Sequence, residues 1–254
     1  MGNEILVNIT PQETRVAIME QGVTQELNIE RTSGRGIVGN IYNGRVSRVL
    51  PGMQSAFVDI GLDRAAFLHV ADIWEADQNG DATKPIEKLL FEGNSIVVQI
   101  IKDALGSKGA RLSTQISLAG RMLVYLPQES HIGISQRIED DNERELLKEK
   151  LQHVLPIEEK GGYIIRTMAE AADECDLRAD IEYLHKLWQD IQRKSLTNAS
   201  PTLLYQDLDL SHRVLRDFVN DDTTRIQIDS RENYQKLVIF AENYMTNIVE
   251  RIAL

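Results

Sequence analysis

Short apolar strands separated by glycine-containing turns follow one another at even spacing from Ile37 to Ile116. The stretch predicts five strands, in the segments IVGNIYNGRVSRVL, QSAFVDI, AAFLHV, NSIVVQIIKD and ARLSTQI. Five such strands in about eighty residues are typical of a small closed barrel such as an oligonucleotide-binding fold. The acidic and polar stretch Ala71–Lys84, between the third and fourth strands, is expected to form a surface loop.

The segments on either side of this predicted barrel have different patterns. Three alternating strands are expected before it, at Glu4–Thr10, Arg15–Glu20 and Val23–Glu30, and the glycines of Arg31–Gly39 mark a domain crossing. After Leu118 the pattern is mixed. It predicts strands at Arg121–Leu126, Tyr163–Arg166 and Thr224–Ile228, and helices at Glu143–Leu155, from Leu177 to Ile191, at Leu210–Asn220 and from Ser230 onward. The chain is therefore expected to be an α+β protein of two or three compact units.

The charge of the chain is unfavourable for non-specific binding of nucleic acid. Its net charge is −11 over 254 residues. The predicted barrel is close to balanced, with eight Lys or Arg against nine Asp or Glu in residues 36–116, so a local basic face remains possible there. A single cysteine excludes a disulfide framework and a clustered-cysteine zinc site. No apolar run approaches the roughly 20 residues of a membrane span, and we expect a cytoplasmic protein.

Aromatic and basic residues on the predicted barrel strands form a first candidate site. Phe57 and Phe67, with Tyr42, accompany basic residues that include Arg45 and Lys108. Proteins that bind single strands stack bases on exposed aromatic rings and hold the backbone with cations. The alternative is that both phenylalanines belong to the barrel core, because an aromatic residue in an alternating strand usually faces inward.

A second candidate site is the pair Arg166 and Thr167, at the end of a predicted strand. An arginine fork beside a hydroxyl and exposed backbone amides can hold a phosphate through several charge-assisted hydrogen bonds. The alternative is that Arg166 pairs with Glu170 or Asp173.

Spacing alone identifies no catalytic or metal-ligating residue. The sequence contains no phosphate-binding loop, no HExxH, no GxSxG and no dinucleotide fingerprint, and its five histidines are scattered. Asp229 at the end of a predicted strand is one carboxylate, which is weak evidence for a metal.

Several ordered segments resemble the ribonuclease E/G family. They are NIYNG (Asn40–Gly44), VSRVLPGM (Val46–Met53), AFVDIG (Ala56–Gly61), AFLH (Ala66–His69), KGARL (Lys108–Leu112), ISLAG (Ile116–Gly120), GISQRI (Gly133–Ile138) and IIRT (Ile164–Thr167). The likeness spans nearly the whole chain and is weakest at Ala71–Glu87. The segment RGIVGNIY (Arg35–Tyr42) is more similar to the shorter, G-type branch of the family than to the E-type branch.

The resemblance implies a discontinuous RNase H-like domain into which an S1-type barrel and an α/β 5′-sensor domain are inserted. The expected boundaries are 1–35 and 198–254 for the RNase H-like domain, 36–116 for the S1 barrel and 117–197 for the sensor.

The resemblance also implies roles for individual residues. The family's positions for the RNA 5′-monophosphate correspond to Arg166, Thr167, Gly120 and Val124, and its RNA-binding positions to Phe57, Phe67, Lys108 and Arg137. Tyr42 and Arg45 join the RNA-binding set from the barrel pattern. The first of two arginines that the family carries after GIS is Gln136 here, which puts a phosphate contact at that position in doubt.

The expected partner is single-stranded RNA with a 5′-monophosphate. Members of the family cleave RNA with magnesium held by two aspartates in a later domain, share a zinc ion between protomers, form homo-oligomers, and act in ribosomal RNA maturation and messenger decay. No aspartate here matches a catalytic position, so we expect the chain to bind RNA without cutting it, with no cofactor of its own. The alternatives are a free-standing RNA-binding adaptor, an enzyme that uses Asp229, and a protein-interaction scaffold whose barrel aromatics are core.

Overall fold

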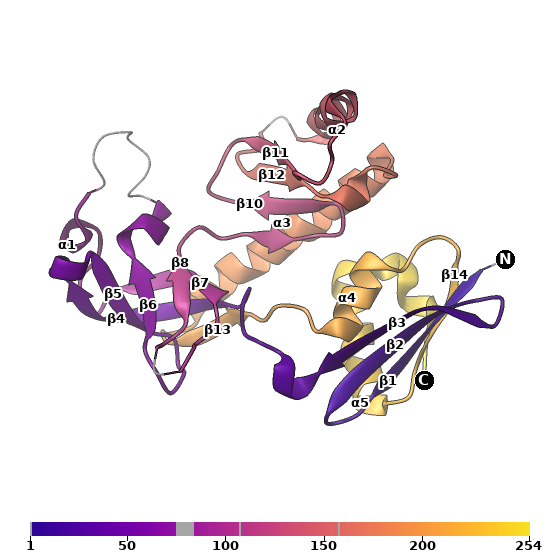
Figure 1. Cartoon of the computed structure of the whole chain (residues 1–254), viewed down its shortest axis with the longest axis horizontal. Helices are drawn as coiled ribbons and strands as arrows, with labels where there is room; N and C mark the ends of the chain where they lie inside the picture. Colours follow the sequence, from indigo (N-terminus) through magenta and orange to yellow (C-terminus); the bar gives the residue numbers. More distant parts are fainter. Residues whose placement is uncertain (1, 75–83, 107, 157) are drawn as a thin grey trace. The chain divides into compact units, whose positions relative to one another are not determined.

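The computed structural model describes residues 2–74, 84–106, 108–156 and 158–254. The chain forms two compact units, the first from Met1–Gly36 with Leu208–Leu254 and the second from Ile37–Asp207. Both contain helices and strands, so the fold is α+β as predicted (Figure 1). Among the described residues no helix combines the length and apolar character that a membrane crossing requires. Most of the expected loop Ala71–Lys84 lies outside the described residues.

The first unit is a five-stranded sheet with two helices on one face. Its elements are β1 (Asn3–Ile9), β2 (Glu13–Glu20), β3 (Val23–Arg31), α4 (Leu210–Asp217), β14 (Thr223–Ile228), α5 (Arg231–Tyr244) and β15 (Ile252–Ala253). The strand order is β15-β14-β1-β2-β3; β14 runs parallel to β1 and to β15, and β2 runs antiparallel to β1 and β3. Alternation along the strands turns Ile5, Val7 and Val16 inward, where they pack with Val214 and Leu237 of the helices.

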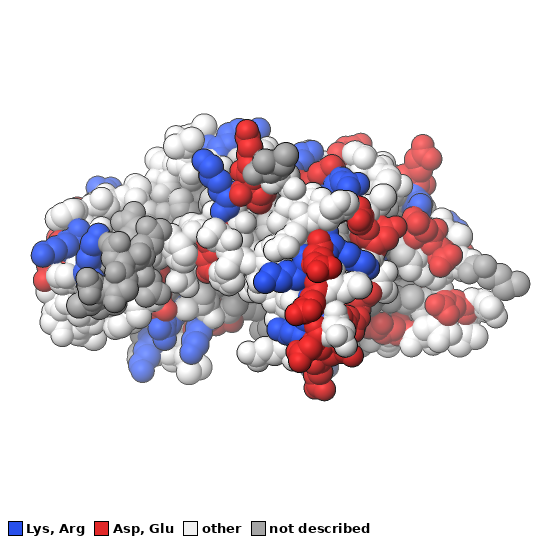
Figure 2. Space-filling model, turned by 90° about the horizontal axis from the view of Figure 1, so that it is seen from above, with Lys and Arg blue, Asp and Glu red and all other residues white. Residues whose placement is uncertain are grey.

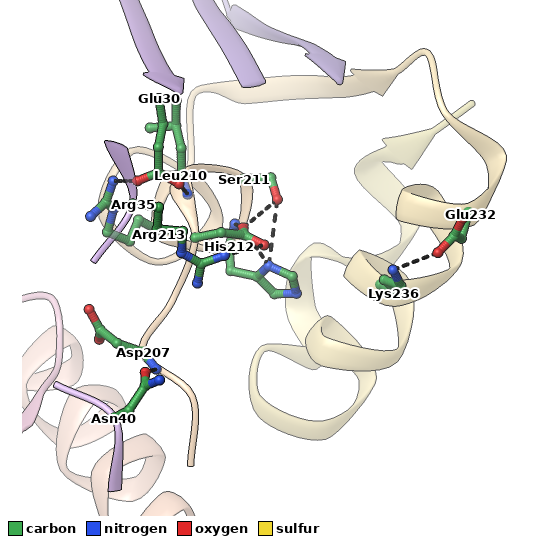
Figure 3. Close-up of polar contacts among 11 residues, drawn as sticks. Glu30, Arg35, Asn40, Asp207, Leu210, Ser211, His212, Arg213, Glu232 and Lys236 are labelled. Carbon is green, nitrogen blue, oxygen red and sulfur yellow. Dashed lines mark hydrogen bonds and ion pairs between the residues drawn. The ribbon is translucent and has the colours of Figure 1, made fainter. Parts of the chain in front are cut away.

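Polar contacts attach the start of α4 to the sheet (Figure 3). Glu30 of β3 accepts hydrogen bonds from the backbone N–H of Leu210, at 3.1 Å, and from Nη2 of Arg213, at 2.6 Å. Asp209 caps the helix, because its Oδ1 accepts from the backbone N–H of His212 at 3.0 Å and lies 2.7 Å from the ring Nδ1 of His212. Burial by itself raises the pKa of the Asp209 carboxyl, but its hydrogen bonds and charge interaction with His212, and the Ser211 hydroxyl, outweigh burial and hold that pKa below its usual 3.8.

The Asp209 cap is therefore expected to make stability depend on pH. A carboxyl with a depressed folded-state pKa contributes fully above its unfolded pKa and loses that contribution as the pH falls below it. Asp209→Ala should lower the free energy of unfolding of this unit by about 1–2 kcal/mol at pH 7, and by less at pH 3, as measured by urea unfolding. The exposed Asp221→Ala serves as control and should change it by under about 0.5 kcal/mol. A cost of Asp209→Ala that is the same at both pH values would contradict this assignment.

A closed five-stranded barrel forms one part of the second unit. Its strands are β4 (Ile41–Leu50), β5 (Ser55–Asp59), β6 (Ala66–His69), β7 (Ser95–Lys102) and β8 (Arg111–Ser113), and the short helix α1 (Ile86–Leu89) lies between β6 and β7 in sequence. The order is β4-β5-β6-β8-β7, and β7 pairs again with β4, which closes the barrel. A Cβ on Gly44 would lie 2.5 Å from Cγ1 of Val58, so only glycine permits the close approach of β4 and β5 there.

An additional strand, β13 (Thr202–Tyr205), pairs with β4 beside the barrel. The second segment of the first unit consequently begins at Leu208, ten residues after the boundary expected at 198. The difference has a simple cause, because backbone hydrogen bonds attach residues 202–205 to the barrel sheet.

The rest of the second unit is a four-stranded sheet with two helices. It contains β9 (Leu118–Ala119), β10 (Leu123–Leu126), β11 (Ile132–Ile134), α2 (Asp141–Val154), β12 (Gly162–Ile165) and α3 (Glu174–Thr197), with strand order β11-β12-β10-β9. The spacing of Leu177, Ile181, Leu184 and Ile191 predicted the buried face of α3, and all four are buried. Trp188, assigned to the same face, is only half-buried.

Candidate nucleic-acid interface

Basic and aromatic residues line up across the outside of the barrel. The strand pairing sets Arg48 opposite Phe57, Phe57 opposite Phe67, Phe67 opposite Arg111 and Arg111 opposite Lys102. Directly paired residues on neighbouring strands point to the same side of a sheet. We call this row, Arg48, Phe57, Phe67, Arg111 and Lys102, the basic–aromatic stripe.

The two phenylalanines of the stripe face outward. Their strand neighbours Ala56, Val58 and Leu68 are fully buried in the barrel, whereas Phe57 is 36% exposed and Phe67 is half-buried. Their rings contact edge to face, with centroids 6.2 Å apart and planes at 66°. The structure thus decides against the alternative in which both rings are core, because the alternation of β5 and β6 fills the barrel with smaller aliphatic side chains.

The basic members of the stripe differ in their contacts. Nε of Arg111 donates to Oδ2 of Asp72 at 2.9 Å and Nη2 to Oδ1 at 3.1 Å. This hydrogen-bonded pairing, followed by the charge of Asp72, raises the pKa of Arg111 above its usual value. Arg48 and Lys102 are exposed and, within the described residues, pair with no carboxylate. In Figure 2 the barrel, at the left of the view, shows more basic than acidic side chains, whereas acidic side chains gather where α2 lies.

The structure places the other expected RNA-binding residues of the barrel apart from the stripe. Tyr42 is 6% exposed in the barrel core, so its ring is not available for stacking and the expectation for it was wrong. Arg45 is exposed but stands opposite Asp59 of β5. Lys108 is exposed in the turn between β7 and β8, where its backbone pairs with that of Leu105.

The start of β10 and the ends of β11 and β12 lie side by side at the same end of the four-stranded sheet. The backbone N–H of Arg166, just after β12, donates to the carbonyl of Met122 before β10, at 2.8 Å. On the other side of β12, the N–H of Ser135 donates to the carbonyl of Ile165, also at 2.8 Å. The chain segments that carry Gly120, Arg166 and Arg137 are therefore brought together, although they are distant in sequence.

Arg166 is tied to the turn before β10. Its Nη1 donates to the carbonyl of Gly120 and, at 3.2 Å, to that of Arg121. Because Arg166 follows Ile164 at a spacing of two, and Ile164 pairs with Val124, these three residues lie on the same side of the sheet. The opposite side, with Leu123 and Ile165, is buried.

Asp180 holds this turn in place, a role that the sequence analysis missed. The carboxylate is 7% exposed on α3 and accepts the backbone N–H groups of Arg121, Met122 and Leu123 at 2.9, 2.9 and 2.8 Å. A Cβ on Gly120 would lie 2.5 Å from both carboxylate oxygens, so the turn requires glycine. A signal was available, because Asp180 follows Leu177 by three residues and falls on the otherwise apolar face of α3.

The remaining residues of the second candidate site are partly accessible. Thr167 begins a short 3₁₀ turn, Thr167–Ala169, directly after Arg166 and is half-buried, as is Val124. Arg137 and Gln136 are both exposed, in the turn that follows β11. Arg144 of α2 fixes that turn, because its Nη1 donates to the carbonyls of Ser135 and Ile138 at 2.9 and 2.8 Å.

Tyr163 of β12 belongs to a largely buried polar cluster. The hydroxyl of Tyr163 lies 2.8 Å from Nε2 of His185 and donates to Glu159 at 3.1 Å. Burial, followed by the charge of Glu159, raises the pKa of Tyr163 well above its usual range and that of Tyr125 to about 12. Both phenols therefore stay neutral and act as packing and hydrogen-bonding groups.

Asp229, the carboxylate considered for a metal, has structural partners. Its Oδ1 accepts the backbone N–H of Ile9 at 2.9 Å, and its Oδ2 accepts from the side-chain amide of Asn8. In the described part of the chain, no three His, Cys, Asp or Glu side chains are grouped so that they could hold a metal ion.

The chain is similar to known ribonucleases along almost its entire length. The family model "Ribonuclease E/G family" matches residues 117–254. Ribonuclease G of Escherichia coli K12 is 47% identical over 99% of this chain and 53% of its own length, and ribonuclease G of Haemophilus influenzae is 46% identical over 99% and 52%. Ribonuclease E of Haemophilus influenzae is 34% identical over 98% of this chain and 27% of its own length. The chain thus spans about half the length of the ribonuclease G relatives that it matches.

Proposed function

Because the chain belongs to the ribonuclease E/G family, we propose that it is the region with which an RNA-processing enzyme of this kind holds single-stranded RNA and senses its 5′-monophosphate. The observation that carries the proposal is the pair of outward-facing rings, Phe57 and Phe67, set between cations on a closed barrel. Membership of the family indicates RNA as the class of ligand, and the outward-facing rings indicate the surface that would bind it.

The barrel is proposed to be an S1-type oligonucleotide-binding fold. A base that stacks on one exposed ring gains roughly 1–3 kcal/mol without regard to sequence, since every base has a π-face. Lys108 is proposed to contact the RNA backbone near Phe67. The protein chain just after Lys108 runs beside the strand of Phe67, because the N–H of Phe67 donates to the carbonyl of Ala110 at 2.8 Å. Arg45 remains a more peripheral candidate.

The second candidate site is proposed to bind the 5′-monophosphate. Arg166 and Thr167 would donate to the phosphate oxygens, with backbone help from Gly120 and Val124 and a further charge from Arg137. A 5′-hydroxyl offers these donors no anion, and a triphosphate is bulkier and more highly charged. The pocket would therefore distinguish processed from primary transcripts through the difference in pairing.

The first unit is proposed to be RNase H-like. Its strand order, β3-β2-β1-β14-β15, with three antiparallel strands followed by two that run parallel to β1, supports this proposal, as do the helices α4 before β14 and α5 between β14 and β15. In this region Asp229 hydrogen-bonds to β1 and the residue after it serves as the helix cap of α5. A scaffold role is consistent with these contacts.

Cleavage with magnesium, the zinc shared between protomers and homo-oligomer formation are proposed for the longer proteins of the family. Among the described residues no three His, Cys, Asp or Glu side chains are grouped to hold a metal ion, and no step is assigned to magnesium or zinc in this region. We propose that the chain alone binds RNA without cutting it, and that the enzyme acts in the bacterial cytoplasm, in ribosomal RNA maturation and messenger decay.

Binding of a 3′-labelled single-stranded oligonucleotide, followed by fluorescence anisotropy, tests the proposal. Phe57→Ala should weaken binding by roughly 5- to 150-fold, the equivalent of one lost base stack of about 1–3 kcal/mol. Phe91→Ala is the matched control, because Phe91 is also exposed, at 61%, but precedes β7 outside the stripe. The control should bind as the unaltered chain does, and both variants should keep their circular dichroism spectra.

Two outcomes would favour the alternatives. Unchanged affinity in a folded Phe57→Ala variant would point to a protein-interaction scaffold. Magnesium-dependent cleavage of a 5′-monophosphorylated oligonucleotide by this chain, lost in Asp229→Ala, would point to an enzyme that uses its own carboxylates.

A further inference from the structure

The two ends of the basic–aromatic stripe carry the cations least engaged in internal contacts on that row. Arg48 on β4 and Lys102 on β7 are exposed, and neither pairs with a carboxylate among the residues that the structure describes. By contrast, Arg111 shares its charge with Asp72, and in the first unit Arg213 and Arg216 are likewise paired with carboxylates. In a chain with a net charge of −11, two exposed cations on one row of a barrel attract an anion to that row.

We propose that single-stranded RNA crosses the barrel along the stripe, from β4 to β7, with a phosphate held by Arg48 at one end and another held by Lys102 at the other. The proposal rests on the RNA binding proposed above and defines its path and its charged contacts. It makes the row of strand-paired residues, rather than the two aromatic rings alone, the unit of recognition.

The length of the stripe suits a short stretch of RNA. Its five residues stand on five neighbouring strands, and four strand spacings of about 4.8 Å give roughly 19 Å. This distance matches a segment near the lower end of the about 4–16 nucleotides that one barrel of this type covers. Because the planes of Phe57 and Phe67 are inclined by 66°, each ring offers its own stacking face, and two bases rather than one occupy the centre.

Asp72 positions Arg111 within this path. It engages Nε and Nη2, on one edge of the guanidinium group, which leaves the edge formed by Nη1 and Nη2 and the flat faces of the group outside that pairing. Arg111 stands directly beside Phe67 in the strand pairing. Its orientation is therefore set before RNA arrives, while much of its charge is already balanced, so within the stripe the salt dependence should come mainly from Arg48 and Lys102.

The test measures the affinity for a 5′-hydroxyl, single-stranded oligonucleotide between 50 and about 300 mM salt, by fluorescence anisotropy. The 5′-hydroxyl end removes any contribution of the Arg166 pocket. Each cation that contacts a phosphate of a single strand contributes about 0.7 to the slope of log affinity against log salt. Arg48→Gln and Lys102→Gln should each lower that slope by about 0.7, and the double variant by about 1.4. Lys88→Gln, which removes an exposed cation of α1 outside the stripe, should leave the slope unchanged.

Phe57→Ala separates this inference from the proposed function. It should lower the affinity without changing the slope, because it removes a stacking contact and no charge. If the unaltered chain fails to bind, or Phe57→Ala binds equally well, the proposed RNA binding itself is refuted. If Phe57→Ala weakens binding but the Arg48 and Lys102 variants keep the full slope, or Lys88→Gln lowers it equally, only the path along the stripe is refuted.

Discussion

Arg166→Ala is expected to abolish the preference of the chain for 5′-monophosphorylated over 5′-hydroxyl RNA. A hydrogen bond to a charged group contributes about 1.5–3 kcal/mol, so affinity for the monophosphorylated oligonucleotide should fall by roughly 10- to 150-fold. Affinity for the 5′-hydroxyl oligonucleotide should change by less than about 2-fold, because the barrel stripe provides that binding. Anisotropy titrations with the two oligonucleotides, identical except at the 5′ end, measure the ratio.

The structure suggests two companion variants for Arg166→Ala. Arg166→Lys keeps the positive charge but loses the planar fork that reaches the carbonyls of Gly120 and Arg121, so it should retain only part of the preference. Arg193→Ala removes an arginine of α3 that pairs with Asp190, and it should retain all of the preference. An Arg166→Ala chain that keeps the unaltered ratio would show that the 5′ end is read elsewhere.

Asp180→Ala is expected to be strongly destabilising. It leaves three backbone N–H groups, two of them on buried residues, without the carboxylate that accepts them. An unsatisfied buried donor costs about 1–3 kcal/mol, and the loss of a charged acceptor adds to that cost, so the free energy of unfolding should fall by about 3 kcal/mol or more. Asp180→Asn, whose amide oxygen can still accept, should lose less.

The unfolding signal for the Asp180 variants should come only from the sheet and helix that Asp180 joins. The sequence contains two tryptophans, so in a Trp74→Phe background the fluorescence of Trp188 on α3 reports urea unfolding of the sheet and helix that Asp180 joins. Glu182→Ala removes an exposed acid two residues further along α3 and should shift the free energy by under about 0.5 kcal/mol.

A functional consequence accompanies the loss of stability. Since Asp180 holds the turn whose carbonyls accept from Arg166, Asp180→Asn should also reduce the 5′-monophosphate preference in chains that remain folded. If Asp180→Ala lowers the free energy of unfolding no more than Glu182→Ala does, the three backbone N–H groups have found other acceptors.

The regular elements were largely predictable because their patterns are local. Alternation placed β1, β2 and β3 within one or two residues of their observed bounds, and the spacing of apolar residues placed α3. The strands β9, β11, β13 and β15, of two to four residues, were not predicted, because none of them lies in a longer alternating segment of the kind that indicated the equally short β6, β8, β10 and β12.

Tyr42 shows where reasoning from the pattern failed. Ile41–Gly44, the first part of β4, are all buried rather than alternating. Tyr42 points into the barrel core, while the side-chain amide of Asn43 donates to the carbonyls of Ser195 and Asn198 at 3.4 and 3.2 Å. Both sides of the strand are therefore covered, and one of the covering segments lies about 150 residues away in the chain.

The sequence by itself determined the α+β class, the closed barrel and the family, because strand alternation, helix spacing and short ordered motifs are properties of neighbouring residues. It could name Phe57, Phe67 and Arg166, but it left open whether the rings faced inward and what the arginine contacted. Only the tertiary structure decided that the rings lie outside, between Arg48 and Lys102, and that Asp180 shapes the turn beside Arg166. Strand register and the approach of a helix to a distant turn depend on how segments pack, and packing joins residues that no local pattern connects.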